Sequence, residues 1–418
     1  MTDVMPEVAE ESTATTDIRP FNVPKVSDTD LADLRRRIIE TRWPERETVN
    51  DTSQGVQLAT MQALARYWGT DYDWREFDTR LSAIPQFVTE IDGLDIHFIH
   101  VRSKHENALP IIVTHGWPGS IVEQLKIIEP LTNPIAHGGT AADAFHVVIP
   151  SLPGYGFSAK PTTTDWEPPH IAKAWIELMT RLGYKQFVAQ GGDWGNAITE
   201  IMALMTPPGL LGVSTNMAAT VPPDISKALA MGAPAPSSLT AEERNAYKQL
   251  DFFYKKGLAY ANEMGLRPQT LYAIADSPVG LAAWILDHDA SSYDLIARVF
   301  NGAREGLTRD DILDNISLYW FTNTALSSGR LYWTTRQLPG GGGFFDARGV
   351  AIPMVVTVFP DEIYAAPRSW AEKAYRKMIF YRKHDRGTHF AAWEQPDYLT
   401  QDLREGFRPL RTQLVDRS

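Results

Sequence analysis

The feature of this chain that most constrains its fold is a series of short, fully apolar segments separated by amphipathic stretches. The segments have the length of strands, and polar residues do not alternate along them, which is typical of strands buried on both faces of a sheet. Such strands, alternating with amphipathic helices, predict an α/β fold with a mostly parallel sheet and helices on both faces. The apolar segments are Ile111-Ile112-Val113, Val147-Val148-Ile149 and Phe187-Val188-Ala189, and a helical period comprises Ile171, Ala174, Trp175, Leu178, Met179 and Leu182.

Composition divides the 418 residues into five segments. Residues 1–17 are acidic and rich in serine and threonine, so we expect a disordered tail there. Residues 18–86 show helical periods and are expected to form an N-terminal extension. The α/β core is expected over 87–218 and again over 346–418. Between these two parts, 219–345 combines proline-rich loops with several helical periods, which predicts a helical cap inserted between two strands.

Three local patterns predict where individual elements begin. Ser27, three residues before Asp30, is typical of a helix N-cap. Asp92-Gly93 lies between two alternating segments and predicts the tight turn of a β-hairpin. A strand pattern resumes beyond the cap, from Ile352 to Phe359. The hairpin is therefore expected to begin the core, directly after the helical extension.

The charge of the chain argues against nucleic acid and anionic membranes as partners. Lysine and arginine number 40, aspartate and glutamate number 51, and the net charge is −11. There are no cysteines, which excludes disulfides, thiolate metal sites and cysteine nucleophiles. No apolar run reaches the roughly 18 residues of a membrane-spanning helix, and the N-terminus lacks the features of a signal peptide. We therefore expect a cytoplasmic protein and leave a homodimer open.

One aspartate stands at the apex of a sharp turn after the third apolar segment, in Gly191-Gly192-Asp193-Trp194-Gly195. The pattern Gly-x-nucleophile-x-Gly describes a strained turn from a strand to a helix, with small residues where neighbouring chains pack closely. A carboxylate at this position attacks an sp3 carbon that carries a leaving group, so the substrate would be an epoxide or a halide. In the alternative interpretation, Asp193 is only the N-cap of the following helix.

The loop after the first apolar segment favours the catalytic interpretation. It reads His115-Gly116-Trp117-Pro118-Gly119-Ser120, and in this fold such a loop supplies one backbone N–H to an oxyanion hole. The residue after the nucleophile supplies the second, so the expected donors are Trp117 and Trp194. The alternative is a tight Gly-Pro turn with His115 as a structural histidine. The peptide bond between Trp117 and Pro118 can be cis, because bonds before proline tolerate that form.

A base and an acid are expected near the C-terminus. His389 lies between the apparent strand that begins at Met378 and a following helix, in the chain order nucleophile, acid, histidine. Its predicted role is to activate water, because histidine titrates near neutral pH; the alternatives are a loop histidine and His384, which we assign to the strand. Asp361 and Glu362 both qualify by position as the orienting acid. Asp224, after the sixth strand, is a further alternative.

Opening of an epoxide also needs a proton donor for the departing oxygen. A phenol suits this role, because its pKa of about 10 keeps it protonated at neutral pH. The segment predicted as the cap holds several tyrosines, and their spacing alone does not choose among them: Tyr247, Tyr254, Tyr260, Tyr272, Tyr293, Tyr319 and Tyr332.

Further motifs accompany the turn at Asp193, namely Trp43-Pro44, the segment from Asp276 to Leu281 and Gly387-Thr388-His389-Phe390-Ala391-Ala392. Together with the two loops above, they resemble those of the microsomal-type epoxide hydrolases. Members of that family have the α/β-hydrolase fold with an N-terminal extension and a helical cap. The resemblance covers residues 18–410.

The resemblance implies a role for five residues. Asp193 would be the nucleophile and His389 the base. The acid of the family is the fourth residue of a Phe-Pro-x-(Asp/Glu) run, which is Glu362 here. Two cap tyrosines that bind the epoxide oxygen correspond to Tyr260 and Tyr319. The family needs no cofactor and no metal, and the expected partner is a small hydrophobic epoxide substrate.

Two alternatives to an epoxide hydrolase stay open at this point. A haloalkane dehalogenase shares the aspartate nucleophile, but it would need halide-binding N–H donors instead of a tyrosine pair. A non-hydrolytic protein of the same fold would bind or open an epoxide in a biosynthetic setting. The tyrosine in Asn315-Ile316-Ser317-Leu318-Tyr319-Trp320 argues against the dehalogenase.

Overall fold

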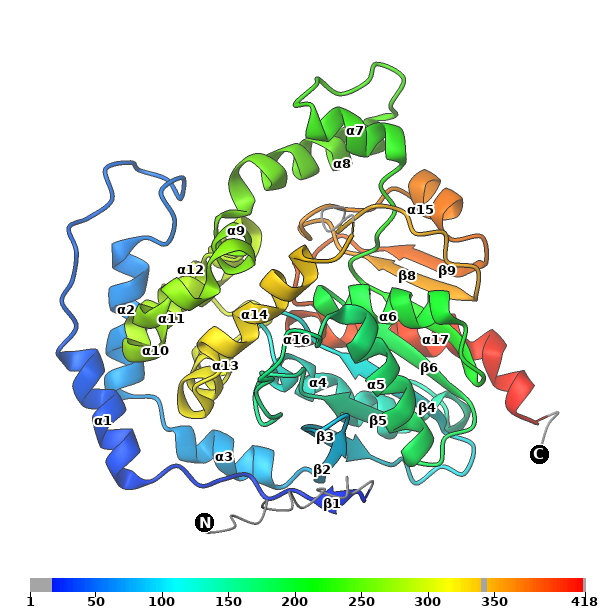
Figure 1. Cartoon of the computed structure of the whole chain (residues 1–418), viewed down its shortest axis with the longest axis horizontal. Coiled ribbons are helices and arrows are strands. Elements are labelled where there is room, and N and C mark those ends of the chain that lie inside the picture. Colours follow the sequence, from blue (N-terminus) through cyan, green and yellow to red (C-terminus); the bar gives the residue numbers. More distant parts are fainter. Residues whose placement is uncertain (1–16, 340–343, 416–418) are drawn as a thin grey trace, which may run out of the picture.

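The computed structural model describes residues 17–339 and 344–415, with side chains up to residue 411. Nearly all of the predicted tail, residues 1–16, lies outside the described part of the chain. In the described residues, one large α/β unit carries a layer of helices on one side (Figure 1). None of the described helices is both long and apolar enough to cross a membrane.

A single nine-stranded sheet forms the centre, in the order β1-β2-β3-β5-β4-β6-β7-β8-β9. The first three strands pair antiparallel, β3 pairs antiparallel with β5, and all pairs from β5 to β9 are parallel. The predicted mostly parallel α/β fold is therefore confirmed. The strands are β1 (Arg19–Pro20), β2 (Gln86–Ile91), β3 (Leu94–Val101), β4 (Leu109–Thr114), β5 (Phe145–Pro150), β6 (Phe187–Gly191), β7 (Leu210–Thr215), β8 (Met354–Val358) and β9 (Met378–Lys383).

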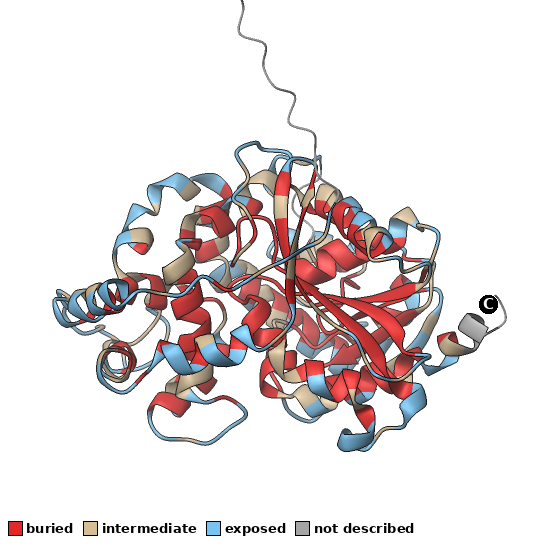
Figure 2. Ribbon diagram, turned by 90° about the horizontal axis from the view of Figure 1, so that it is seen from below, coloured by how far each residue is buried: buried red, intermediate tan, exposed pale blue. Residues whose placement is uncertain are grey.

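Burial explains why the central segments form strands. Every residue of β4, β5, β6 and β8 is buried, as expected for parallel strands covered on both faces. The hairpin between β2 and β3 turns at Asp92 and Gly93, whose φ angles are 50° and 78°. Two consecutive positive φ angles are typical of a type I′ hairpin turn, so the predicted hairpin is confirmed. Figure 2 shows the buried residues concentrated along the sheet and the helices beside it.

Two pairs of helices cover the central strands. The chain moves from β4 to β5 in one direction along the sheet and from β5 to β6 in the other, so right-handed crossovers place α4 and α5 on opposite faces. Helix α17 packs against α4, and α6 packs against α5. These helices of the core are α4 (Ile121–Thr132), η1 (Pro134–His137), η2 (Ala141–Asp143), α5 (Pro168–Arg181), α6 (Trp194–Met205), α15 (Arg368–Ala374), α16 (Ala391–Glu394) and α17 (Pro396–Val415).

The layer between β7 and β8 is helical. It runs diagonally across the molecule in green to yellow in Figure 1 and covers one edge of the core. We call this layer the cap. Its helices are α7 (Pro223–Ala230), α8 (Ala241–Phe252), the π-helix η3 (Phe253–Gly257), α9 (Ala259–Leu266), η4 (Pro268–Thr270), α10 (Tyr272–Asp276), α11 (Pro278–Leu286), α12 (Ala290–Phe300), α13 (Arg309–Thr322) and α14 (Ala325–Arg336).

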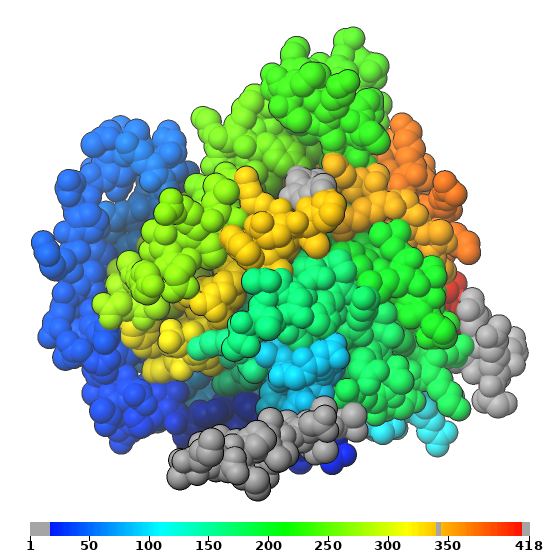
Figure 3. Space-filling view, in the orientation of Figure 1, coloured from blue at the N-terminus to red at the C-terminus, as the bar shows by residue number. Residues whose placement is uncertain are grey.

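Three helices of the N-terminal part pack against the cap. Helix α1 begins where Ser27 accepts a hydrogen bond from the N–H of Asp30, which confirms the predicted N-cap. Helices α1 and α2 contact α11, α2 also contacts α12, and α3 contacts α13. Figure 3 shows these segments in blue along the outer side of the cap. The helices are α1 (Asp28–Ile39), α2 (Leu58–Thr70) and α3 (Trp74–Ser82).

Candidate active site

Asp193 lies at the turn between β6, which ends at Gly191, and α6, which begins at Trp194. Its φ of 51° and ψ of −128° place a non-glycine residue in a strained region of the backbone map. A Cβ on Gly191 would lie 2.1 Å from the carbonyl of Gly195, and a Cβ on Gly195 would lie 2.0 Å from the carbonyl oxygen of Thr114. The glycines of the motif are therefore required by close approach, and the turn presents the Asp193 side chain at the carboxyl edge of the sheet.

The loop after β4 holds one oxygen of this carboxylate. The backbone N–H of Trp117 donates to Asp193 Oδ1 at 2.8 Å. Gly116 permits this approach, because a Cβ there would lie 2.1 Å from the same oxygen. The bond between Trp117 and Pro118 is cis. For Trp194, the second expected donor, no hydrogen bond to Asp193 is present among the described residues, and its contribution to an oxyanion hole stays a prediction.

His389 faces the other oxygen. Its Nε2 lies 3.6 Å from Asp193 Oδ2, and its Nδ1 lies 2.7 Å from Glu362 Oε1. Glu362 is itself fixed, because the same oxygen accepts the N–H of Ile363 at 2.7 Å. Burial lowers the pKa of His389, but the charge and hydrogen bond of Glu362 and the charges of Asp193 and Asp289 raise this pKa to about 10. In this state His389 is a cation between carboxylates at neutral pH.

The other candidates for the acid and the base lie elsewhere. Asp361 is exposed, whereas Glu362 is only 3% exposed. Asp224 is exposed in the first turn of α7, and no ion pair joins it to His389 in the described structure. His384 was assigned to the strand, but β9 ends one residue earlier; its Nε2 binds Asp402 Oδ2 at 2.8 Å.

Within the described part of the chain, no hydrogen bond joins His115 to Asp193. Its ring is buried, its Nε2 accepts the N–H of Leu152 at 3.2 Å, and its Nδ1 lies 3.0 Å from the carbonyl oxygen of Gly116. Burial lowers its pKa to about 4, against a smaller opposing effect of the Gly116 carbonyl. His115 is therefore a neutral histidine that ties the loop after β4 to the loop after β5.

The two tyrosines implied by the resemblance have different surroundings. Tyr260 stacks on Trp117, with ring centroids 4.9 Å apart and an interplanar angle of 14°. The hydroxyl of Tyr319 donates to the carbonyl oxygen of Gly119 at 2.7 Å. Burial raises the pKa of both phenols well above 10, so both keep their proton. Tyr260 borders the cavity at Asp193, and Tyr319 lies outside its lining.

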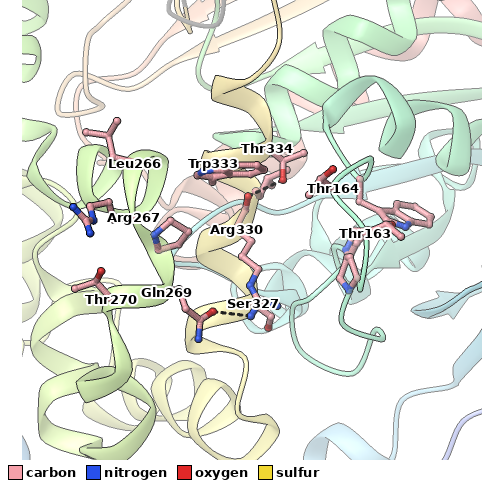
Figure 4. A pocket seen from close by; sticks show the side chains of 15 residues that line it. Thr163, Thr164, Leu266, Arg267, Gln269, Thr270, Ser327, Arg330, Trp333 and Thr334 are labelled. Carbon is pink, nitrogen blue, oxygen red and sulfur yellow. Dashed lines mark hydrogen bonds between the residues drawn. The ribbon is translucent and has the colours of Figure 1, made fainter.

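A cavity of about 480 Å³ opens at Asp193 between the cap and the core. Its lining is mainly apolar and aromatic, as in most small-molecule sites. Another cavity, of about 470 Å³, lies between η4, α14 and residues 161–166, and contains none of the predicted site residues (Figure 4). The lining of the cavity at Asp193 includes Trp194, Leu258, Tyr260, Tyr332, Phe344 and Phe345.

Sequence reasoning missed a second histidine at Asp193. His288 lies in the link between α11 and α12, and its Nε2 is 3.9 Å from Asp193 Oδ2. Its Nδ1 lies 2.9 Å from Asp289 Oδ2. The other oxygen of Asp289 accepts the N–H of Ser292 at 2.8 Å and caps α12. The sequence allows Asp289 to be recognised as the N-cap of α12. Nothing in the sequence indicates that the preceding residue, His288, faces the core.

Tyr332 and Glu123 were also not selected. Tyr332 borders the cavity, with its ring 4.8 Å from Trp194 and 5.9 Å from Tyr260. Glu123, on α4, is buried near Asp193, and burial raises its pKa to about 8 against an opposing effect of His389. At neutral pH this carboxyl is therefore mostly protonated.

The same place could accept a metal ion. Asp193, His288 and His389 each offer a ligand atom, and these atoms lie within 4.8 Å of one another. A carboxylate behind each histidine would fix the ring, as is usual in metal sites. Elsewhere in the described chain no group of three such residues meets the same distance. The expectation of a metal-free enzyme stays a prediction.

The arrangement is suited to nucleophilic attack by a carboxylate. One oxygen of Asp193 is held by a backbone N–H, the other faces a largely apolar cavity, and a buried histidine–glutamate pair stands beside it. Such a pair can deprotonate a water molecule for attack on an ester, while the backbone donor stabilises the charge that develops on the carbonyl oxygen.

Two family models match the chain. Residues 18–124 match the model described as epoxide hydrolase N terminus, and residues 110–271 match the model described as alpha/beta hydrolase fold.

Relatives and solved structures agree with these matches. A putative epoxide hydrolase of Stigmatella aurantiaca (strain DW4/3-1) is 49% identical over 395 residues, which cover 94% of this chain and 86% of that protein. Epoxide hydrolase 1 of Sus scrofa is 34% identical, with coverage of 93% and 88%. The crystal structure of juvenile hormone epoxide hydrolase from the silkworm Bombyx mori has a TM-score of 0.84 at 29% identity and covers 96% of this chain and 97% of that one. The structure of Aspergillus niger epoxide hydrolase has a TM-score of 0.78 at 30% identity, with coverage of 95% and 98%.

Proposed function

The chain belongs to the epoxide hydrolase family, and from this premise we propose that it converts an epoxide and water into a vicinal diol through an ester of Asp193. The predicted family and activity are confirmed by these relatives. The residues that carry the reaction, and its substrate, are the content of the proposal.

In the first step, Asp193 Oδ2 attacks a ring carbon of the epoxide. Oδ1 is engaged by Trp117, so Oδ2 is the oxygen left to form the new bond. The ring carbon–oxygen bond breaks, and the departing oxygen takes a proton from a tyrosine hydroxyl, for which Tyr260 and Tyr319 are the candidates. Formation of the ester removes the charge of Asp193, which lowers the pKa of His389 and releases its proton to the tyrosine.

In the second step, neutral His389 takes a proton from water, and the hydroxide adds to the carbonyl carbon of the ester. Glu362 holds the ring of His389 and stabilises the cation that forms. The oxyanion develops on Oδ1, at the N–H of Trp117. The bond between the carbonyl carbon and Oδ2 then breaks with its electron pair on Oδ2. Oδ2 takes up the second proton of the water, directly or through a neighbouring acid, and becomes a hydroxyl oxygen of the diol, while Asp193 returns to its carboxylate form.

One observation carries this proposal: the two oxygens of Asp193 have different partners. Oδ1 accepts the N–H of Trp117 at 2.8 Å, while Oδ2 lies 3.6 Å from His389 Nε2. The cavity at Asp193 supports the proposed substrate class, because its aromatic and apolar lining favours a small hydrophobic epoxide. The cytoplasmic location and a homodimer stay predictions.

The test is turnover of a panel of aryl and alkyl epoxides by the wild type and Asp193→Asn. We expect diol formation to fall by about 10⁴ or more in the variant, since loss of the nucleophile removes the covalent path. Mass spectrometry of the variant excludes deamidation to aspartate. Asp224→Asn, at an exposed aspartate of the cap, is the matched control and should keep full activity.

Two outcomes would contradict the proposal. The first is diol formation by undeamidated Asp193→Asn at the wild-type rate. The second is release of halide from haloalkanes by the wild type without diol formation from any epoxide of the panel.

A further inference from the structure

A second histidine–carboxylate pair reaches Asp193 from the cap. His288 Nε2 lies 3.9 Å from Asp193 Oδ2, the same oxygen that faces His389. The rings of His288 and His389 have centroids 4.4 Å apart. Asp289 holds His288 Nδ1 at 2.9 Å, just as Glu362 holds His389 Nδ1 at 2.7 Å. One oxygen of Asp193 is thus flanked by two histidines, each oriented by its own carboxylate.

The environment of His288 distinguishes it from a histidine that only fills space. The ring is 2% exposed, and its Nε2 has no hydrogen-bond partner. Burial of an unpartnered ring nitrogen is costly, so such a group calls for a partner, and a bound substrate can supply one. Besides His389, the neighbouring rings belong to Trp117, Tyr260 and Phe390, and none of them forms a hydrogen bond with this nitrogen.

We propose that His288 is a further catalytic residue, the general acid that protonates Asp193 Oδ2 as the ester breaks. This inference rests on the proposed function, since it assigns a proton donor to the second step of that reaction. In this step His389 removes a proton from water, and His288 supplies a proton to the leaving group.

The chemistry balances atom by atom. Water loses one proton to His389 Nε2, and its hydroxide adds to the carbonyl carbon of the ester, giving an oxyanion on Oδ1. On collapse, the bond from this carbon to Oδ2 breaks, and the electron pair leaves with Oδ2. Oδ2, now attached only to the substrate carbon, takes the proton from His288 Nε2 and becomes a hydroxyl of the diol.

The regenerated Asp193 carries its old Oδ1 and the oxygen of the water, with one proton. A carboxylic acid is more acidic than an imidazolium, so this proton passes to His288. Asp289 keeps the ring of His288 in place for this exchange, because its Oδ2 lies 2.9 Å from Nδ1. The site is then ready for the next substrate, with no reagent besides the epoxide and water.

Leaving-group chemistry explains why an acid at Oδ2 is needed. An alkoxide is a poor leaving group, whereas the N–H of Trp117 stabilises only the charge on Oδ1. A donor within reach of Oδ2 therefore acts on a bond that the oxyanion hole does not assist.

The experiment follows the ester of Asp193 in single turnovers that are quenched in acid and analysed by intact mass. His288→Gln should form the ester at nearly the wild-type rate and hydrolyse it about 10²-fold more slowly, so that the ester accumulates. Asp289→Asn should show a smaller defect of the same kind, because asparagine still caps α12 but carries no charge. A chelator is present throughout, because the same three groups could hold a metal ion.

A second readout separates acid catalysis from a structural effect. Propylene oxide and its trifluoromethyl analogue give leaving alcohols of different acidity, and the more acidic alcohol needs less help from an acid. The hydrolysis defect of His288→Gln should therefore be several-fold smaller for the trifluoromethyl substrate. His384→Gln, which removes the histidine of another histidine–aspartate pair outside the site, is the matched control and should change neither step.

Two results would overturn the inference. One is an ester that forms and decays in His288→Gln as in the wild type. The other is a hydrolysis defect of equal size for both substrates in a variant with wild-type circular dichroism and melting temperature. Failure of the proposed function looks different, because the wild type itself would then give no Asp193 ester.

Discussion

The two histidine–carboxylate pairs at Asp193 differ in what anchors them. His389 and Glu362 follow β9 and β8, so the central sheet fixes their positions. His288 and Asp289 lie between two helices of the cap, and Asp289 is fixed as the N-cap of α12. The core pair, His389 and Glu362, is therefore held by the central sheet, whereas the cap pair, His288 and Asp289, reaches Asp193 only because the cap packs on the core.

This difference suggests that the two halves of the reaction draw on different layers. In the proposed mechanism, attack by Asp193 and activation of water use groups at the edge of the sheet. The phenols and the second histidine, which we propose as proton donors to the departing oxygens, come from the cap. A change in the cap could thus alter the substrate or the proton donors while the core pair stays the same.

The largest expected effect is on the core side. His389→Gln should still form the ester of Asp193, because the carboxylate is intact, but should hydrolyse it about 10³-fold more slowly or worse. The ester should therefore accumulate to about one per chain, as measured by intact mass after a quench. Rapid decay of the ester in this variant would move the role of base to the cap pair.

The next effect tests which acid orients His389. Glu362→Gln should lower kcat by roughly 10²- to 10⁴-fold, because the amide no longer stabilises the imidazolium. Asp361→Asn is the matched control, since Asp361 is exposed and adjacent, and steady-state kinetics should show no change. If the two variants behaved in the opposite way, the core pair would have been assigned to the wrong acid.

A smaller effect is expected for the cap phenols. Tyr319→Phe should slow formation of the ester by about tenfold to a hundredfold with little change in folding, because only the hydroxyl is lost. Tyr247, in α8, also donates its hydroxyl to a backbone carbonyl, so Tyr247→Phe is the matched control. This variant should leave the rate of ester formation unchanged. Ester formation at the wild-type rate in Tyr319→Phe would instead favour Tyr260 or Tyr332, which both border the cavity.

The smallest effect concerns stability. The pKa of His389 in the folded protein is about 10, against an ordinary value of 6.5, so the native state binds more protons than the unfolded state between these pH values. The free energy of unfolding should therefore fall as pH rises through this window, and the stabilisation is fully present below 6.5. In urea unfolding, the free energy of unfolding of His389→Gln should depend less on pH than that of the wild type. The difference should be clearest above pH 8, because Glu123, with a pKa of about 8, has then lost its proton and no longer adds its own pH dependence. Parallel curves for the two proteins would contradict the charge assigned to His389.

The core pair could be predicted because parallel strands bring their carboxyl ends to one edge of the sheet. The sequence placed Trp117 and Asp193 in loops after two apolar segments, and His389 after the apparent strand that begins at Met378, in the chain order nucleophile, acid, histidine. The rule of the carboxyl edge added the candidates for the orienting acid. It could not choose between Asp361 and Glu362, because adjacent residues share that edge and differ only in burial. The resemblance to the family made that choice, and the hydrogen bond to His389 supports it.

The cap side could not be predicted in the same way. His288 lies in a short link between helices, where no period indicates which side chain faces the core. Tyr319 was selected by resemblance, yet its hydroxyl binds the Gly119 carbonyl, while Tyr332 lines the cavity. Which phenol faces a ligand depends on how the cap packs on the core, and that packing is a tertiary property.

The central claim, a covalent bond between Asp193 and the substrate, is tested most directly by a single turnover in ¹⁸O-labelled water with enzyme in excess. The account predicts an unlabelled diol, because its new hydroxyl oxygen is Oδ2 of Asp193, and a label in the Asp193 peptide after proteolysis. A labelled diol and an unlabelled Asp193 peptide would show that water attacks the epoxide directly and would contradict the account.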